Sequence, residues 1–119
     1  MLVGALACAA TAPAAAGDRL YGLIGRMTVS PGRRDEVATL LLAAITDIPG
    51  CLSYVVAEDP SDPDAFWITE VWDSERSHDA SLSLPQVRAV IARARPMITG
   101  FGERHVTAPL GGSGLASPR

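Results

Sequence analysis

Lysine is absent from this chain: all ten basic residues are arginines, they are scattered among thirteen carboxylates, and the net charge is −3. A nucleic-acid-binding surface needs basic side chains gathered on one face, where they neutralise phosphates. Because no segment gathers its arginines in this way, we expect no nucleic-acid partner.

Cysteine is almost absent as well. Cys8 lies in an alanine-rich stretch and Cys51 lies in an apolar run. The two residues offer neither a metal-ligand spacing nor a disulfide framework. We therefore expect no metal site, and a reducing compartment, the cytoplasm, as the location.

The common catalytic signatures are missing too. The sequence has no GxSxG elbow, no phosphate-binding loop of the Walker type, no GxGxxG after a strand and no HExxH. The glycine-rich Gly111-Gly-Ser-Gly is followed by no helix, so it has the character of a linker. These absences argue against the familiar hydrolases, nucleotide-binding enzymes and zinc proteases.

The 119 residues fit one small domain. Residues 1–17 are rich in alanine and uncharged, and we expect either a flexible extension or a signal segment, the latter implying secretion. Thr11 and Pro13 make this stretch weakly apolar, so no membrane partner is expected. Residues 109–119 have the composition of a flexible tail. The working domain is therefore residues 18–108.

The first half of this domain alternates between strand and helix patterns. Residues 21–29 predict a strand, after which Ser30 and Pro31 have the types preferred at an N-cap and a first helical position. Apolar residues then recur at helical spacing from Val37 to Ile48, and Pro49 stops the pattern. We expect a helix that begins at Ser30 and carries one apolar stripe.

The second half predicts a hairpin, two short helices and a final strand. Residues 51–58 and 65–72 are rich in strand formers and flank a turn-rich segment. Ser74 can cap a helix through Leu82, Pro85 can open another through Arg95, and residues 99–107 predict the last strand. The order β-α-β-β-α-β predicts an α+β, ferredoxin-like split βαβ fold, with a four-stranded antiparallel sheet and helices on one face.

Apolar side chains occur at both parities of the predicted hairpin. Phe66 and Trp72 share one parity, whereas Trp67 and Val71 share the other; Phe101 and Val106 of the last strand also differ in parity. A sheet with one solvated face alternates more cleanly. Because the helices cover one face only, we expect a homodimer in which two sheets pack together.

Three segments carry a family resemblance: Tyr21-Gly-Leu-Ile-Gly-Arg-Met-Thr-Val-Ser-Pro-Gly-Arg-Arg-Asp-Glu-Val, Pro49-Gly-Cys-Leu-Ser-Tyr54 and Thr69-Glu-Val-Trp-Asp-Ser-Glu75. In this order and spacing they resemble the antibiotic biosynthesis monooxygenase (ABM) domain family. The stretch His78-Asp-Ala-Ser-Leu-Ser-Leu-Pro-Gln-Val-Arg88 and the residues up to 102 are similar to its quinol monooxygenase branch.

The resemblance implies a dimeric α+β barrel. It also implies oxygenation of a small aromatic substrate, an electron-rich quinol or polycyclic phenol, by O2 without any cofactor. Such chemistry needs a dry aromatic pocket, a base and polar groups that hold the anion. A non-catalytic dimer that binds a small apolar ligand, or serves in stress, is the alternative.

Two residues are the catalytic candidates. His78 is the candidate base, because an imidazole titrates near neutral pH; the alternative is a solvated surface histidine. Many relatives carry a histidine at the position of Ser81, which is one helical turn from His78 and is a candidate for substrate binding. Trp72 matches the tryptophan that the resemblance places in the pocket wall.

The remaining candidates for substrate binding lie on the strands. Glu70 shares the parity of Trp72, and a carboxylate among apolar side chains needs a partner; Arg26 is the expected one, which would make Glu70 structural rather than catalytic. Tyr54 and Trp67 are expected to line either the pocket or the dimer core.

Haem-degrading relatives share the fold but carry an asparagine and a haem-ligating histidine in registers that match Gly25 and Ile91 here. Neither residue can replace its counterpart. The resemblance therefore disfavours haem degradation.

Overall fold

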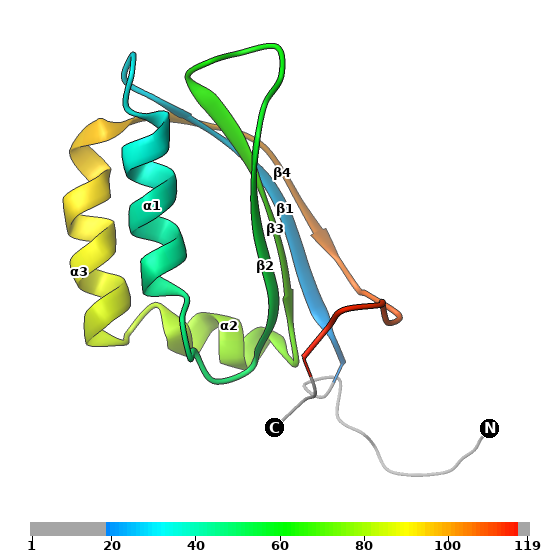
Figure 1. Cartoon of the computed structure of the whole chain (residues 1–119). Helices are drawn as coiled ribbons and strands as arrows, with labels where there is room; N and C mark the ends of the chain where they lie inside the picture. The colour runs from blue at the N-terminus through cyan, green and yellow to red at the C-terminus, as the bar shows by residue number, and fades with distance from the viewer. Residues whose placement is uncertain (1–18, 117–119) are drawn as a thin grey trace, which may run out of the picture.

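The computed structural model describes residues 19–116 and shows the predicted order of elements (Figure 1). The antiparallel sheet has the strand order β2-β3-β1-β4. The ferredoxin-like prediction is confirmed, and three of the strands have the predicted bounds. The elements are β1 (Tyr21–Val29), α1 (Arg34–Ala44), β2 (Cys51–Glu58), β3 (Ala65–Trp72), α2 (Glu75–Ser81), α3 (Pro85–Ala94), the 3-10 turn η2 (Arg95–Met97) and β4 (Ile98–Thr107).

The predicted start of the first helix is wrong. Ser30 forms a turn whose carbonyl accepts a hydrogen bond from the Arg33 amide at 3.0 Å, and Gly32 has a φ of 79°. This left-handed conformation is incompatible with a right-handed helix, so α1 begins at Arg34, after the turn. The Gly32 amide instead donates to Asp64 Oδ1 at 3.0 Å, which ties the turn to the β2–β3 loop.

The other helix boundaries follow the predicted signals more closely. The Ser74 side chain accepts a hydrogen bond from the Ser77 amide at 3.1 Å, which confirms it as the N-cap of α2. Pro85 is the first residue of α3. The predicted end of the first helix at Pro49 is wrong, because α1 ends at Ala44 and a turn follows in which Asp47 has a φ of 58°. Ile48 nevertheless remains buried, as the stripe predicts.

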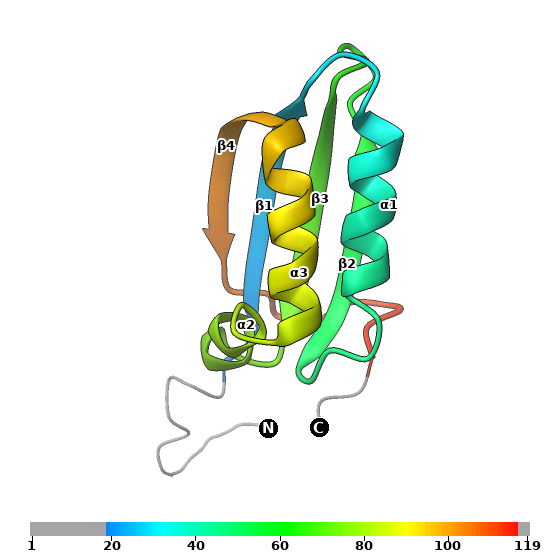
Figure 2. The same ribbon diagram turned by 90° about the vertical axis from the view of Figure 1, so that its left-hand side faces the viewer.

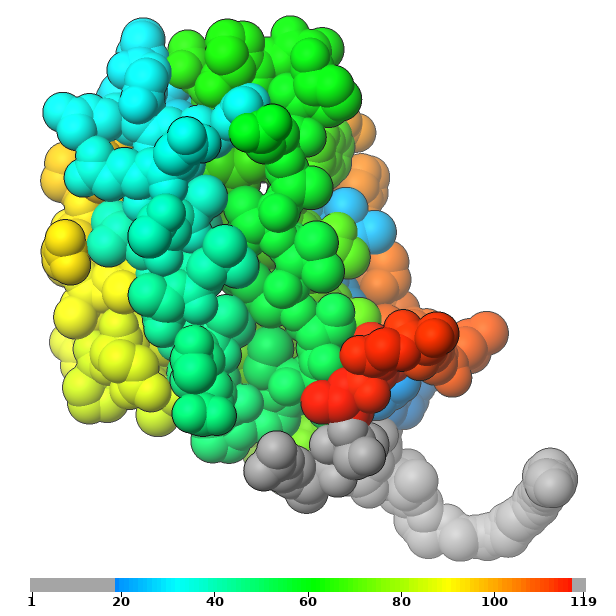
Figure 3. Space-filling model, viewed as in Figure 1, coloured from blue at the N-terminus to red at the C-terminus, as the bar shows by residue number. Residues whose placement is uncertain are grey.

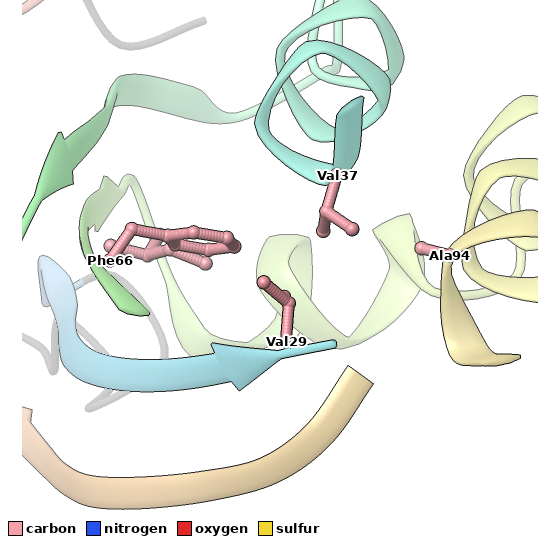
Figure 4. Close-up of a cluster of buried hydrophobic side chains, with 5 residues drawn as sticks. Val29, Val37, Phe66 and Ala94 are labelled. Carbon is pink, nitrogen blue, oxygen red and sulfur yellow. The ribbon is translucent and has the colours of Figure 1, made fainter. Parts of the chain in front are cut away.

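Helices α1 and α3 lie side by side on one face of the sheet, with α2 at its lower end (Figures 1 and 2). The main core forms where the two long helices meet the central strands (Figure 4). Its buried members are Val29, Val37, Phe66, Ile68 and Ala94. Burial of these apolar side chains fixes the helices on the face of β3 that carries Phe66 and Ile68.

The opposite face of the sheet, called here the outer face, has no helix over it in the described part of the chain. Trp67 and Val71 of β3 lie on it, half-buried, and Val55 of β2 is 53% exposed. Both faces of the hairpin are therefore apolar, as predicted.

The parity prediction for the last strand is wrong. A register shift between Gly25 and Met27 inserts an extra residue into β4. As a result, Phe101 pairs with Met27, Val106 pairs with Leu23, and both lie on the helix side.

The segment after β4 returns towards β2. The Ala116 amide donates a hydrogen bond to the Leu52 carbonyl at 3.0 Å, and this segment (red in Figure 3) lies against the lower end of the strands. Among residues 19–116, no helix has the length and apolar character needed to cross a membrane. The prediction of a signal segment or extension at residues 1–17 concerns residues outside the described part.

Candidate active site

Two adjoining pockets lie on the helix side of the sheet. The pocket nearer to β4, about 280 Å³, is bounded by β1, β3, β4 and the end of α2. It is called here the outer pocket, although it lies on the helix side and not on the outer face. The inner pocket, about 120 Å³, lies between α1, α3 and strands β2 and β3. Glu70, His78 and Leu82 line both pockets. These three residues therefore form the boundary, called here the neck.

His78 is held at the neck by two aromatic neighbours. Its ring meets Trp72 edge-on, with centroids 5.5 Å apart, and lies 5.3 Å from the Tyr21 ring. Its side chain is only 13% exposed. This packing contradicts the alternative of a solvated surface histidine.

The His78 ring is also oriented by a hydrogen bond. Its Nδ1 lies 2.9 Å from Asp79 Oδ1. Because a carboxylate oxygen only accepts, Nδ1 carries the hydrogen, and in the neutral ring Nε2 keeps a lone pair. A base needs such a free nitrogen, and Asp79 is in the position of the group that orients it.

Ser81 lies near His78, as its helical spacing predicts. It is buried, lines the inner pocket, and its Oγ donates to the His78 carbonyl at 2.6 Å. The Ser81 hydroxyl proton is therefore engaged in a hydrogen bond within α2.

Trp72 and Glu70 lie on one face of β3, as predicted. The indole is 1% exposed, and its Nε1 donates to Glu70 Oε1 at 2.8 Å. This hydrogen bond fixes the carboxylate at the neck, which His78 also lines.

The predicted ion pair between Arg26 and Glu70 is wrong. Arg26 pairs with Asp59 at 2.8 Å and Asp62 at 3.1 Å. It lies opposite Trp67 in the β1–β3 register, whereas Leu23 lies opposite Glu70. Positions of opposite parity face opposite sides of a sheet, so the Arg26 side chain points away from Glu70. Arg26 is nevertheless among the residues that line the outer pocket. Within residues 19–116, Glu70 has no cationic partner at ion-pair distance.

Tyr54 and Trp67, which the sequence left as equivalent candidates, lie on opposite faces of the sheet. Tyr54 lines the inner pocket. Its burial, together with the negative charge of Glu70, raises the pKa of its hydroxyl well above the ordinary value. Tyr54 is therefore a neutral hydrogen-bond donor rather than a base, and Trp67 lies on the outer face.

Sequence reasoning missed several residues of the pockets. Tyr21 and Asp79 contact His78, and Leu82 lies at the neck. Arg104 lines the outer pocket because it pairs with Gly25 on the helix side. The adjacency of Asp79 to His78 was a usable signal; the placement of Arg104 depends on the shift in β4.

The positions compared with haem-degrading relatives also lie here: Gly25 lines the outer pocket and Ile91 the inner one. In the described residues, no three histidine, cysteine or acidic side chains are grouped as metal ligands.

The sequence model of the antibiotic biosynthesis monooxygenase family matches residues 20–93. The chain belongs to this family. Its fold is the family's ferredoxin-like α+β arrangement, that of the dimeric α+β barrels. None of the curated proteins compared with the chain matches it.

Solved structures agree with this assignment. A Chloroflexus aurantiacus protein named for the same family is 57% identical, with a TM-score of 0.79 over 82% of this chain and 99% of that one. Two more distant proteins share the fold. One, from Caulobacter crescentus, is 16% identical (TM-score 0.71, 80% and 93% of the chains). The other, from Mycobacterium tuberculosis, is 24% identical (TM-score 0.65, 79% and 98%).

Proposed function

We propose that this ABM-family protein is a quinol monooxygenase that uses O2 and no cofactor. The observation that carries the proposal is the neck, where an oriented imidazole and a carboxylate that has no cationic partner among residues 19–116 both line two largely apolar pockets. Groups that are poised in this way are suited to proton transfer.

In the proposed reaction, Nε2 of His78 accepts the proton of a quinol hydroxyl. The quinolate then supplies the electrons that reduce O2. One oxygen atom forms a bond to a ring carbon, whose hydrogen is lost, and the other leaves as water. One hydroquinone and one O2 give one hydroxyquinone and one water, so all four electrons come from the substrate.

The roles of the surrounding residues follow from their positions. Asp79 orients His78, Trp72 forms the wall behind it, and Arg104 offers a positive charge to the quinolate in the outer pocket. The carboxylate of Glu70, which lines the same neck, favours the protonated form of His78 after the proton transfer.

The size of the outer pocket favours a quinol of one or two rings over a polycyclic phenol. Its volume of about 280 Å³ lies at the lower limit of ligand pockets, which usually span about 300–1,000 Å³. A larger ring system would extend beyond β4 into solvent.

We also infer a homodimer formed through the outer face. The apolar residues Trp67, Val71 and Val55 lie there without helical cover in the described chain. A second copy of the same face would remove them from water, and a two-fold dimer is the simplest closed assembly.

The test is oxygen uptake by metal-stripped protein with a panel of one-, two- and three-ring hydroquinones. We expect uptake above the autoxidation rate, greatest for the one- and two-ring compounds. Binding of hydroquinones without oxygen uptake would instead support the alternative of a non-catalytic ligand-binding protein. Activity that returns only with added metal or flavin would contradict the proposal.

A further inference from the structure

The inner pocket differs from the outer one in its chemistry. Beyond the neck its walls are mostly aliphatic, formed by Leu41, Ala44, Ile45, Val87, Val90 and Ile91 of α1, α3 and the turn after α1. The Ser81 hydroxyl donates within α2, and Tyr54 is kept neutral. Among the described residues, Glu70 and His78 are the only acidic or basic side chains in the lining of this pocket.

Such a lining accepts apolar groups and rejects charged ones. A dry apolar cavity of about 150 Å³ is large enough to bind benzene. The inner pocket, about 120 Å³, has room for a group of about five carbons when scaled from that case. It is too small for the second ring of a fused aromatic system together with its substituents.

We propose that the inner pocket binds a short alkyl or alkenyl side chain on the quinol ring. This inference rests on the proposed function, because the ring itself would lie in the outer pocket. The two pockets adjoin at Glu70, His78 and Leu82, so a chain passing the neck leaves the ring hydroxyls beside the imidazole. The side chain therefore sets the position of the reacting group as well as the affinity.

The first test is a series of 2-alkylhydroquinones, from the unsubstituted compound to the heptyl one. Each buried methylene contributes about 0.8 kcal/mol, which corresponds to about a fourfold rise in kcat/KM. We expect this rise to continue to about five carbons and then to stop or reverse, because the pocket is full.

The second test fills the pocket. Ala44 is buried on α1 and lines the pocket, whereas its neighbour Ala43 is exposed. Ala44→Leu should reduce the ratio of kcat/KM between pentylhydroquinone and hydroquinone by at least tenfold. The matched control Ala43→Leu should leave this ratio unchanged.

A binding measurement keeps the inference testable where Ala44→Leu folds poorly. In Trp67→Phe protein, the emission reports on Trp72, which lines the inner pocket. We expect n-butylbenzene, which has no hydroxyl to oxidise, to change this emission saturably and more strongly than toluene. Pentylhydroquinone should compete with it.

The outcomes separate the two proposals. The side-chain inference is overturned if oxygen uptake does not depend on chain length and n-butylbenzene does not change the Trp72 emission. The monooxygenase proposal would then still stand. Length-dependent binding without oxygen uptake overturns the monooxygenase proposal while supporting the assignment of the inner pocket to an apolar chain.

Discussion

The two faces of the sheet are built from the same strands but differ in whether their charged side chains form ion pairs. On the outer face, Arg26 is neutralised by Asp59 and Asp62 in one ion-pair cluster. On the helix side, within residues 19–116, Glu70 has no cationic partner at ion-pair distance, and His78 has only the exposed Asp79 carboxylate. The charges of this outer-face cluster are therefore paired with one another, whereas the helix side leaves Glu70 without an opposite charge in the described chain.

The largest difference between the faces should appear in turnover. If His78 takes the substrate proton, His78→Ala should lower turnover by about 10² to 10⁴, the usual contribution of a general base. His105, 61% exposed on β4, provides the control, since His105→Ala should retain activity. Wild-type turnover in His78→Ala would make Glu70 or water the base.

The two tryptophans allow the faces to be compared in stability. Trp72→Ala removes a fully buried indole and should lower the free energy of unfolding by about 3–5 kcal/mol, measured by urea denaturation. Trp72→Phe keeps the wall and should change KM more than stability. Trp67→Ala should cost less in the monomer, because its side chain is half-buried there. If Trp72→Ala and Trp67→Ala lowered the free energy of unfolding equally, the two faces would not differ in their contribution to stability.

Charge on the outer face should affect assembly rather than chemistry. Trp67→Asp or Val71→Asp places an unpaired carboxylate in the proposed dimer contact and should give monomer in light scattering at micromolar concentration. Ala89→Asp, at an exposed position of α3, is the control and should remain dimeric. A monomeric mass for the wild-type protein would reject the outer-face dimer.

The smallest expected effect is a change in stability when the ion-pair cluster of Arg26, Asp59 and Asp62 is disrupted. The Arg26 guanidinium, helped by hydrogen bonds from Ser61, holds the pKa of Asp59 well below its usual value. A depressed folded-state pKa stabilises the protein above the ordinary carboxyl pKa of about 4, and this stabilisation is lost as the pH falls further.

Asp59→Asn should therefore lower Tm at pH 7, and its difference from wild type should shrink below about pH 4. Scanning calorimetry across this range measures the effect. Glu103→Gln, exposed on β4, should change Tm little at either pH. A difference for Asp59→Asn that persists unchanged in acid would mean that the ion pair contributes nothing.

The sequence predicted the strands well because strand composition and turn residues are local signals. The bounds of β1, β2 and β3 agree, and period-two alternation placed Glu70 with Trp72. The start of α1 was missed because residue types alone do not show that Gly32 is left-handed. The shift in β4 was missed because an extra residue in one strand becomes visible only against its partner.

The candidate site was predicted only in part. His78, Trp72, Tyr54, Ser81 and Glu70 all line the inner pocket. The pairing of Arg26 was wrong because parity counted along separate strands does not give the register between them. The turn-rich β2–β3 loop brings Asp59 and Asp62 to Arg26, which its composition alone did not reveal.

Labelling with ¹⁸O2 shows whether the oxygen atom added to the quinol ring comes from O2. Metal-stripped protein oxidising a one-ring alkylhydroquinone under ¹⁸O2 should give a hydroxyquinone that carries one ¹⁸O atom, with the second in water, as read by mass spectrometry. His78→Ala should give almost no labelled product in the same time. A wild-type product without ¹⁸O, or labelled product that forms only with added metal or flavin, would contradict the account.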